Sequence, residues 1–144
     1  MTPYRLFCVT LSTPNIDRTV SWYRDKLGYE VYARRDFPQV GARVAVLEGG
    51  DLRLELLEHK DRLTAGPRLR PGERPHLSQF AVLVDDLDAK MAELRTKNVR
   101  PVWNRRVDHD LGLCFQFIKD CDGNLIQLVE LLEEPGRPRA RLDA

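Results

Sequence analysis

Apolar and polar residues follow two different periods along this chain, and the same order of periods occurs twice. Residues 8–12 alternate with the period of two that is typical of a strand, and apolar residues at helical spacing then run from 16 to 27. Asn15 stands where a helix N-cap is expected, and Gly28 where a helix ends. Residues 79–98 repeat this order at a shift of 71 positions. The pattern therefore predicts two strand-helix segments.

Each of these segments is followed by a second repeated pattern. Residues 44–58 and 116–130 each contain a strand, a glycine-containing turn and another strand, and they match at a shift of 72 positions. Segments around 30–37 and 100–107 supply one more strand in each half. A shift held within one residue over such a length is not expected of two unrelated halves. The chain is therefore predicted to contain two modules, each of strand, helix and three strands.

The predicted domain organisation follows from this repeat. One domain of residues 1–144 contains the modules 4–58 and 76–131, joined by a polar linker at 59–75 that is rich in proline and arginine. A polar tail occupies 132–144. The predicted fold class is α+β, with two βαβββ modules that form a curved, mostly antiparallel eight-stranded cup, or incomplete barrel, with the helices outside.

The two faces of the predicted strands differ in composition. One face is almost wholly aliphatic, which suits packing under the module's own helix. The other face has too many polar groups for a dry core, and it suits the lining of a cavity. The polar residues on this second face are Cys8, Thr10, Ser12, Arg53, Glu55, Gln79 and Gln127. A sheet that curls with this face inward forms a cup.

Composition argues against several classes of protein. The chain has 23 basic and 22 acidic residues and a net charge of +1, which is not expected of a nucleic-acid-binding protein. No apolar run approaches the roughly 18 residues needed to cross a membrane, and the first ten residues lack the features of a signal peptide. Three cysteines without C-x-x-C spacing predict neither a disulfide framework nor a zinc site. We therefore expect a cytoplasmic protein with no nucleic-acid or membrane partner.

The segments PNIDRTVSWYRDKLGYE and KDCDGNLIQLVE, together with the paired modules, resemble the vicinal oxygen chelate superfamily. That superfamily includes glyoxalase I, extradiol dioxygenases, methylmalonyl-CoA epimerase, fosfomycin-resistance enzymes and bleomycin-binding proteins. The resemblance covers about residues 4–131. One departure is Cys121, which stands where relatives often have a proline in an Asp-Pro-Asp-Gly turn. The resemblance implies the cup fold and a homodimer.

The resemblance also implies positions for a metal ion. Metal-using members bind it through one inward residue on the first and last strand of each module, commonly His or Gln, Glu or Gln, His, and Glu. The matching positions here are Cys8, Glu55, Gln79 and Gln127. The histidines, which stand elsewhere, are His59, His76 and His109. Divalent ions favour charged oxygen or imidazole donors, whereas two of the four residues are neutral amides and one is a thiol. We therefore predict no metal cofactor, with a divalent ion on unusual ligands as the alternative.

Glu55 is the candidate catalytic residue, because a carboxylate removed from water can serve as a general base. Two arrangements of Glu55 are open: Arg53 contacts it along the strand, or Glu55 stands in a wet cleft and Arg53 reaches solvent. Cys8 is interpreted as a pocket-lining thiol, since no histidine is matched to it. Trp103 has two interpretations, core packing or stacking on a ligand. The predicted ligand-binding residues are Cys8, Thr10, Arg53, Glu55, Gln79, Trp103 and Gln127.

Two functions fit these residues. The first is a protein of the bleomycin-resistance type that binds a small organic metabolite or natural product in its cup without a metal. The second is an enzyme, either metal-independent with Glu55 as acid and base, or dependent on a divalent metal with unusual ligands. For an enzyme, proton transfer or cyclisation by a lyase or isomerase is expected rather than dioxygenation. Arginine pairs at 34–35 and 105–106 hint at an anionic or carbonyl-rich ligand.

Overall fold

The computed structural model describes residues 3–60 and 77–132. Nearly all of the predicted tail and of the predicted linker lies outside these residues, as does His76. The chain divides into two compact units. Unit 1 takes in Met1–Arg74 and the turn Asp120–Gly123, and unit 2 takes in Pro75–Lys119 and Asn124–Ala144. Each unit therefore contains one predicted module, apart from the short turn.

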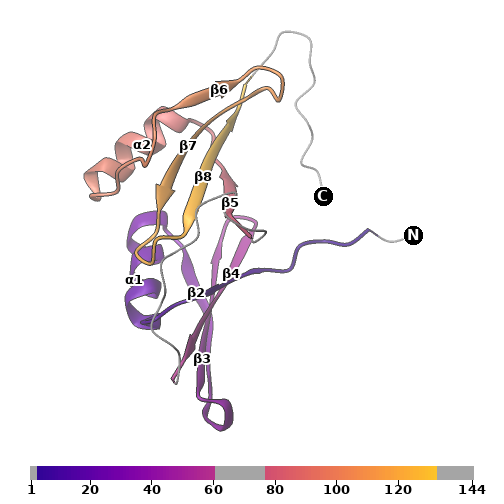
Figure 1. Ribbon diagram of the computed structural model, residues 1–144, viewed down its shortest axis with the longest axis vertical. Helices are drawn as coiled ribbons and strands as arrows, with labels where there is room; N and C mark the ends of the chain where they lie inside the picture. The colour runs from indigo at the N-terminus through magenta and orange to yellow at the C-terminus, as the bar shows by residue number, and fades with distance from the viewer. Residues whose placement is uncertain (1–2, 61–76, 133–144) are drawn as a thin grey trace. The chain divides into compact units, whose positions relative to one another are not determined.

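Unit 1 has the predicted order of strand, helix and three strands (Figure 1). Its elements are β1 (Val9–Ser12), α1 (Ile16–Leu27), β2 (Glu30–Phe37), the 3₁₀ turn η1 (Pro38–Val40), β3 (Ala42–Gly49) and β4 (Leu52–His59). The strand order in the sheet is β1-β4-β3-β2. The β1–β4 pair is parallel and the other two pairs are antiparallel, so α1 makes the crossover that a parallel pair requires.

Helix α1 begins and ends at the residues that the sequence pattern indicates. The Asn15 side chain accepts a hydrogen bond from the backbone N–H of Arg18 at 3.1 Å. Gly28 ends the helix with a φ of 72°, a left-handed conformation that glycine adopts without strain. The buried face of the helix carries Ile16 and Val20, which remove apolar surface from water against the sheet.

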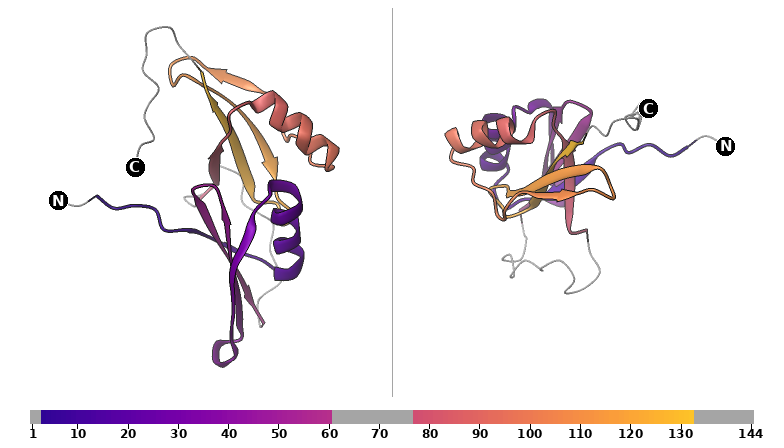
Figure 2. Two further views of the ribbon diagram at one scale, coloured as in Figure 1. Left: turned by 180° about the vertical axis from the view of Figure 1, so that it is seen from behind. Right: turned by 90° about the horizontal axis from the view of Figure 1, so that it is seen from above.

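Unit 2 repeats the same order (Figure 2). Its elements are β5 (Gln79–Leu83), α2 (Leu87–Thr96), β6 (Arg106–Asp108), β7 (Leu113–Lys119) and β8 (Leu125–Leu131). The strand order β5-β8-β7-β6 matches that of unit 1, again with one parallel pair between the first and last strands. Asp86 caps α2 by accepting from the N–H of Ala89 at 2.9 Å. The fold-class prediction of an α+β protein with two βαβββ modules is confirmed.

One predicted strand is much shorter than expected. The sequence pattern placed a strand around 100–107, but β6 has only three residues, starting at Arg106. Pro101 has no N–H to donate to a ladder, and Asn98 has a φ of 60°, which is incompatible with a strand. The N–H of Val102 still donates to the carbonyl of Phe117 at 2.8 Å, so the segment follows β7 without a regular ladder.

The two faces of each sheet differ as predicted. Side chains that face the helices include Leu54 and Leu56 in unit 1 and Ile126 and Leu128 in unit 2, and all four are buried. We call the other side of each sheet its open face. Apart from Ala42 and Leu125, the strand residues there are half-buried or exposed, so side-chain chemistry on the open faces is less constrained by folding. Within the described parts of the chain, neither helix has the length and apolar character needed to span a membrane.

Candidate ligand-binding faces

The open face of unit 1 brings together three of the predicted site residues. Thr10 on β1 lies directly opposite Glu55 on β4 in the parallel ladder. Its hydroxyl Oγ1 donates to Glu55 Oε1 at 3.2 Å. Cys8 lies just before β1, with its Sγ 3.9 Å from the same hydroxyl. A thiol, a hydroxyl and a carboxylate therefore form a short polar row across the edge of this sheet.

Arg53 has a partner that sequence reasoning did not anticipate. It pairs with Glu48, which is opposite it on β3, rather than with Glu55. Both Nε and Nη2 of Arg53 donate to Glu48 Oε1, at 3.1 and 2.6 Å. Its guanidinium also lies 4.8 Å from the Phe7 ring centroid and 5.4 Å from that of Tyr32, within cation–π range. The positive charge of Arg53 is thus paired with Glu48 and not with Glu55.

The open face of unit 2 has amides and aromatic rings in place of charges. Gln79 Nε2 donates to Gln127 Oε1 at 3.5 Å, the long limit of a hydrogen bond. Phe117 lies opposite Gln127 in the antiparallel ladder, and the Trp103 ring packs edge-on against Phe117 with centroids 5.2 Å apart. Trp103 is 49% exposed, so it is packed on one side and open on the other. Core packing therefore holds for one side of the ring, and stacking on a ligand stays a prediction.

The side chains at the four family metal positions do not match the needs of a divalent ion. In unit 1, the Thr10 hydroxyl already donates to the carboxylate of Glu55. In unit 2, the oxygen of Gln127 is engaged by the amide of Gln79. Two neutral amides and a thiol provide little of the negative charge that repays dehydration of a hard cation. Among residues 3–60 and 77–132, no group of three or more His, Cys, Asp or Glu side chains is placed to hold a metal.

Neither of the two described histidines belongs to the polar groups named above. His59 is the last residue of β4 and is exposed. His109 follows β6 and is also exposed.

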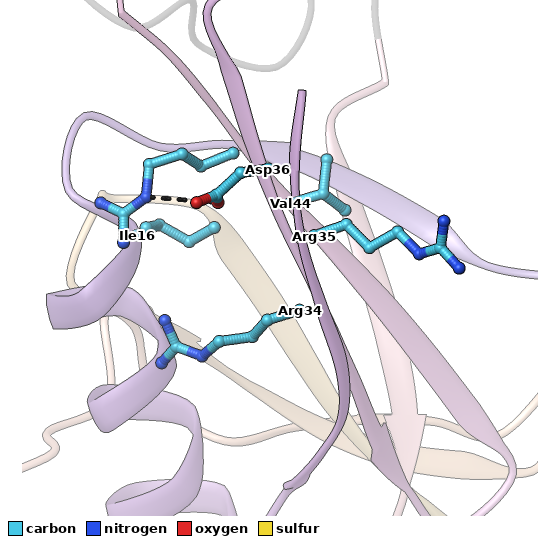
Figure 3. Close-up of a pocket in the computed structure, with 6 residues that line it drawn as sticks. Ile16, Arg34, Arg35, Asp36 and Val44 are labelled. Atoms are coloured by element: carbon cyan, nitrogen blue, oxygen red, sulfur yellow. Dashed lines mark ion pairs between the residues drawn. The ribbon is translucent and has the colours of Figure 1, made fainter. Parts of the chain in front are cut away.

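The predicted arginine pairs prove to be partly structural. Arg34 and Arg35 point to opposite sides of β2, and a hollow of about 250 Å³ lies beside them (Figure 3). On the helix side, Arg34 Nη1 contacts Asp17 Oδ1 at 2.8 Å, and this hydrogen bond lowers the pKa of Asp17. In unit 2, Arg105 contacts Asp88 at 3.3 Å in the equivalent place. These ion pairs link β2 to the first turn of α1 and the residue before β6 to the first turn of α2, which accounts for one arginine of each pair without a ligand.

Two glutamates that the sequence analysis missed hold the helix starts. Glu58 Oε2 accepts from the N–H of Ile16 at 2.7 Å, and Glu130 Oε2 accepts from the N–H of Leu87 at 2.8 Å. The first amides of a helix lack an intrahelical acceptor, and a carboxylate there also interacts favourably with the helix dipole. The two residues are 72 positions apart, so the repeat itself was the signal that identifies them.

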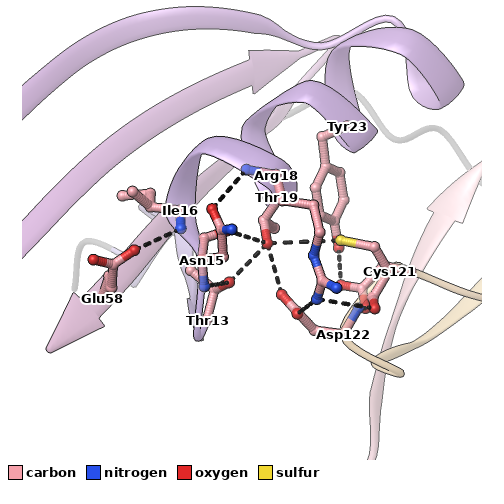
Figure 4. A network of polar contacts seen from close by, with 10 residues as sticks. Thr13, Asn15, Ile16, Arg18, Thr19, Tyr23, Glu58, Cys121 and Asp122 are labelled. Carbon is pink, nitrogen blue, oxygen red and sulfur yellow. Dashed lines mark hydrogen bonds and ion pairs between the residues drawn. The ribbon is translucent and has the colours of Figure 1, made fainter. Parts of the chain in front are cut away.

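A further polar cluster in unit 1 fixes the turn Asp120–Gly123 on α1 (Figure 4). Asp122 accepts from Arg18 Nη2 at 2.6 Å and from the Thr19 hydroxyl at 2.7 Å. The Tyr23 hydroxyl donates to Asp120 Oδ2 at 2.6 Å, and burial followed by the nearby Asp120 charge raises the pKa of Tyr23. The Cys121 thiol packs against Thr19 at 3.6 Å, and burial raises its pKa. This cluster stabilises the turn.

Comparison with known proteins agrees with this architecture. The model of the Glyoxalase/Bleomycin resistance protein/Dioxygenase superfamily matches residues 5–128. The mitochondrial methylmalonyl-CoA epimerase of Mus musculus is 27% identical over 128 residues, which are 86% of this chain and 71% of that protein. The Homo sapiens enzyme is 26% identical over 129 residues, 86% and 72% of the two chains.

A solved structure gives the same result for the fold. The glyoxalase family protein from Enterococcus faecalis has a TM-score of 0.75 and 26% identity, covering 88% of this chain and 97% of that one. The resemblance inferred from the two sequence motifs and the repeat is therefore confirmed. Because the family match spans most of its length, this chain belongs to the glyoxalase/bleomycin resistance protein/dioxygenase superfamily.

Proposed function

We propose that this protein binds a small organic molecule on its open faces without a metal ion. The observation that supports this most directly is the pairing of side chains at the family metal positions. Glu55 is paired with Thr10, and Gln127 is paired with Gln79, so each module's polar groups are hydrogen-bonded to one another. Hydrogen-bonded hydroxyl, carboxylate and amide groups beside apolar residues are what small-molecule sites use to orient a guest.

Each open face offers both polar anchors and apolar contact area. In unit 1, the anchors are Glu55 and the Arg53–Glu48 pair, with the rings of Phe7 and Tyr32 beside them. Both rings are mostly exposed, so a guest that covers them removes apolar surface from water. In unit 2, the amides of Gln79 and Gln127 lie on the face that carries the Phe117 and Trp103 rings.

Native mass spectrometry of freshly purified protein, with elemental analysis of the same sample, tests the proposal. We expect an organic guest and no stoichiometric metal, and we expect treatment with a chelator to leave the guest bound. Gln127→Leu is expected to reduce guest occupancy, whereas Asp110→Asn, a substitution at an exposed position in the turn after β6, is the control. A stoichiometric divalent metal that leaves together with the guest would overturn the proposal.

A second candidate is a metal-independent isomerase, and similarity to methylmalonyl-CoA epimerases favours this class over a lyase or a dioxygenase. In this hypothesis, the Glu55 carboxylate takes a proton from a carbon next to a carbonyl group and returns it to that carbon. The Thr10 hydroxyl would hold the carboxylate in place. In D₂O the wild-type protein should introduce deuterium into the recovered guest, and Glu55→Gln should not. Guest recovered without deuterium from both proteins would leave binding as the function.

We also propose a homodimer, as the family resemblance implies. Analytical ultracentrifugation at micromolar concentration should give twice the chain mass of 16.6 kDa. A mass of one chain under these conditions would contradict the proposal.

A further inference from the structure

The charges on the open face of unit 1 are not balanced at Glu55. Arg53, the cation nearest to it along β4, is hydrogen-bonded twice to Glu48. Within the described residues, the polar partner of Glu55 is the neutral Thr10 hydroxyl, and none of the ion pairs includes Glu55. Glu30, opposite Glu48 on β2, adds a negative charge to this face, and Arg35, farther along β2, adds a positive one. The face therefore has a half-buried carboxylate that is paired with a dipole and not with a cation.

Small side chains leave room beside this carboxylate. The ladder places Val46 next to Glu55 on β3 and Ala33 next to Val46 on β2. Neighbours across a ladder share one face of the sheet, so these residues form a floor beside the acid. Both are half-buried, and neither has a polar group that could reach the carboxylate. A guest that rests on this floor must itself supply the donor for the remaining acceptor sites of Glu55.

The aromatic residues one row away indicate which donor fits. Phe7 and Tyr32 already stack on the guanidinium of Arg53, and they are 73% and 67% exposed. Electron-rich ring faces and a carboxylate both attract positive charge. Building on the metal-free binding proposed above, we infer that the guest carries a protonated nitrogen, such as a primary or secondary ammonium group, which donates to Glu55. This differs from the anionic ligand that the arginine pairs had suggested.

Three probes that share one ring and differ in charge can test this inference. Backbone ¹⁵N–¹H spectra of the full chain are recorded at pH 7 during titration with benzylamine, benzyl alcohol or benzoate. Benzylamine should shift the signals of Thr10, Glu55 and Val46, with an affinity about tenfold higher than that of the alcohol. Glu55→Gln should remove this preference, and Glu30→Gln, which changes an exposed acid on the same face, should retain it. Glu55→Asp keeps the charge and should retain the order of the probes, which separates loss of charge from loss of folding.

The outcomes distinguish this inference from the proposed function. If benzyl alcohol or benzoate binds at these signals as tightly as benzylamine, the face binds small molecules but the ammonium inference is wrong. The same conclusion follows if Glu55→Gln keeps the preference for benzylamine. If no probe shifts these signals, both the inference and small-molecule binding by this face are overturned.

Discussion

In both modules a glutamate near the end of the last strand, Glu58 or Glu130, accepts a hydrogen bond from the first backbone N–H of the helix. The residues on the open face of the sheet, on its other side, differ between the modules. Unit 1 has a carboxylate and an arginine–glutamate pair there, whereas unit 2 has two amides and a row of aromatic rings. We call the helix of each module and the buried sheet face under it the frame. The frame is repeated because helix amides need acceptors and apolar side chains need burial in each half. The open faces are under no such requirement, so the needs of folding do not explain their difference.

The largest expected effect tests whether the two frames are equivalent. Leu54 and Ile126 are fully buried and occupy matching positions of β4 and β8. Leu54→Ala and Ile126→Ala should each lower the free energy of unfolding by about 2–5 kcal/mol, because each removes buried methyl groups and leaves a cavity. Urea denaturation of the two variants measures this. A loss below about 1 kcal/mol in one variant alone would show that the cores differ as well as the faces.

The next prediction concerns a place where the frames differ. Tyr23 of α1 corresponds to Leu94 of α2 in the repeat, and only the tyrosine has a hydroxyl, which donates to Asp120. Tyr23→Phe should lower the free energy of unfolding at pH 7 by about 1.5–3 kcal/mol, since a buried hydrogen bond to a charged group is lost. Leu94→Met, a change of similar size without a hydrogen bond, is the control and should cost less.

The pH dependence of Tyr23 has a definite sign. Burial, with the Asp120 charge second, raises the pKa of Tyr23 above its ordinary value of 10.0. The folded state therefore keeps the proton longer than the unfolded state does. Its contribution to stability is complete below about pH 10 and is lost as the pH rises above that value. Between pH 8 and 11, the midpoint temperature of thermal unfolding should fall less steeply with pH for Tyr23→Phe than for wild type. Tyr29, whose pKa burial raises to about 12, and the thiols Cys114 and Cys121, whose pKa values burial also raises, contribute to the slope that remains.

The helix-start glutamates should behave alike. Glu58→Ala and Glu130→Ala each remove the acceptor for the first helical amide, so each should cost about 1 kcal/mol of unfolding free energy. Glu58→Gln and Glu130→Gln keep an acceptor oxygen and should cost less. Chemical denaturation provides the measurement. A loss of unfolding free energy for one Glu→Ala variant and none for the other would mean that the two modules share a backbone arrangement but not the stabilisation of their helix starts.

Much of this frame could be predicted from the sequence. Period, caps and turns are local signals, so Asn15, Gly28 and Asp86 located the helices correctly. Partners across the sheet could not be assigned in the same way, because they depend on strand register. The alternation placed Arg53 and Glu55 on one face, but only the ladder shows that Arg53 meets Glu48. The strand around 100–107 was predicted too long, because the repeat indicates where a strand belongs but not where Pro101 interrupts its ladder.

The smallest expected effect on stability is also the sharpest test of the contrast between frame and face. Thr10→Val removes a hydroxyl that is exposed, and Gln127→Leu removes an amide whose bond to Gln79 is at the limit of length. Neither group is needed to satisfy a buried backbone atom, so each variant should change the unfolding free energy by about 0.5 kcal/mol or less. Both should change guest affinity. If either variant destabilises the protein as strongly as Glu58→Ala, the open face contributes to the frame, and its polar pairs are then explained by folding without any guest.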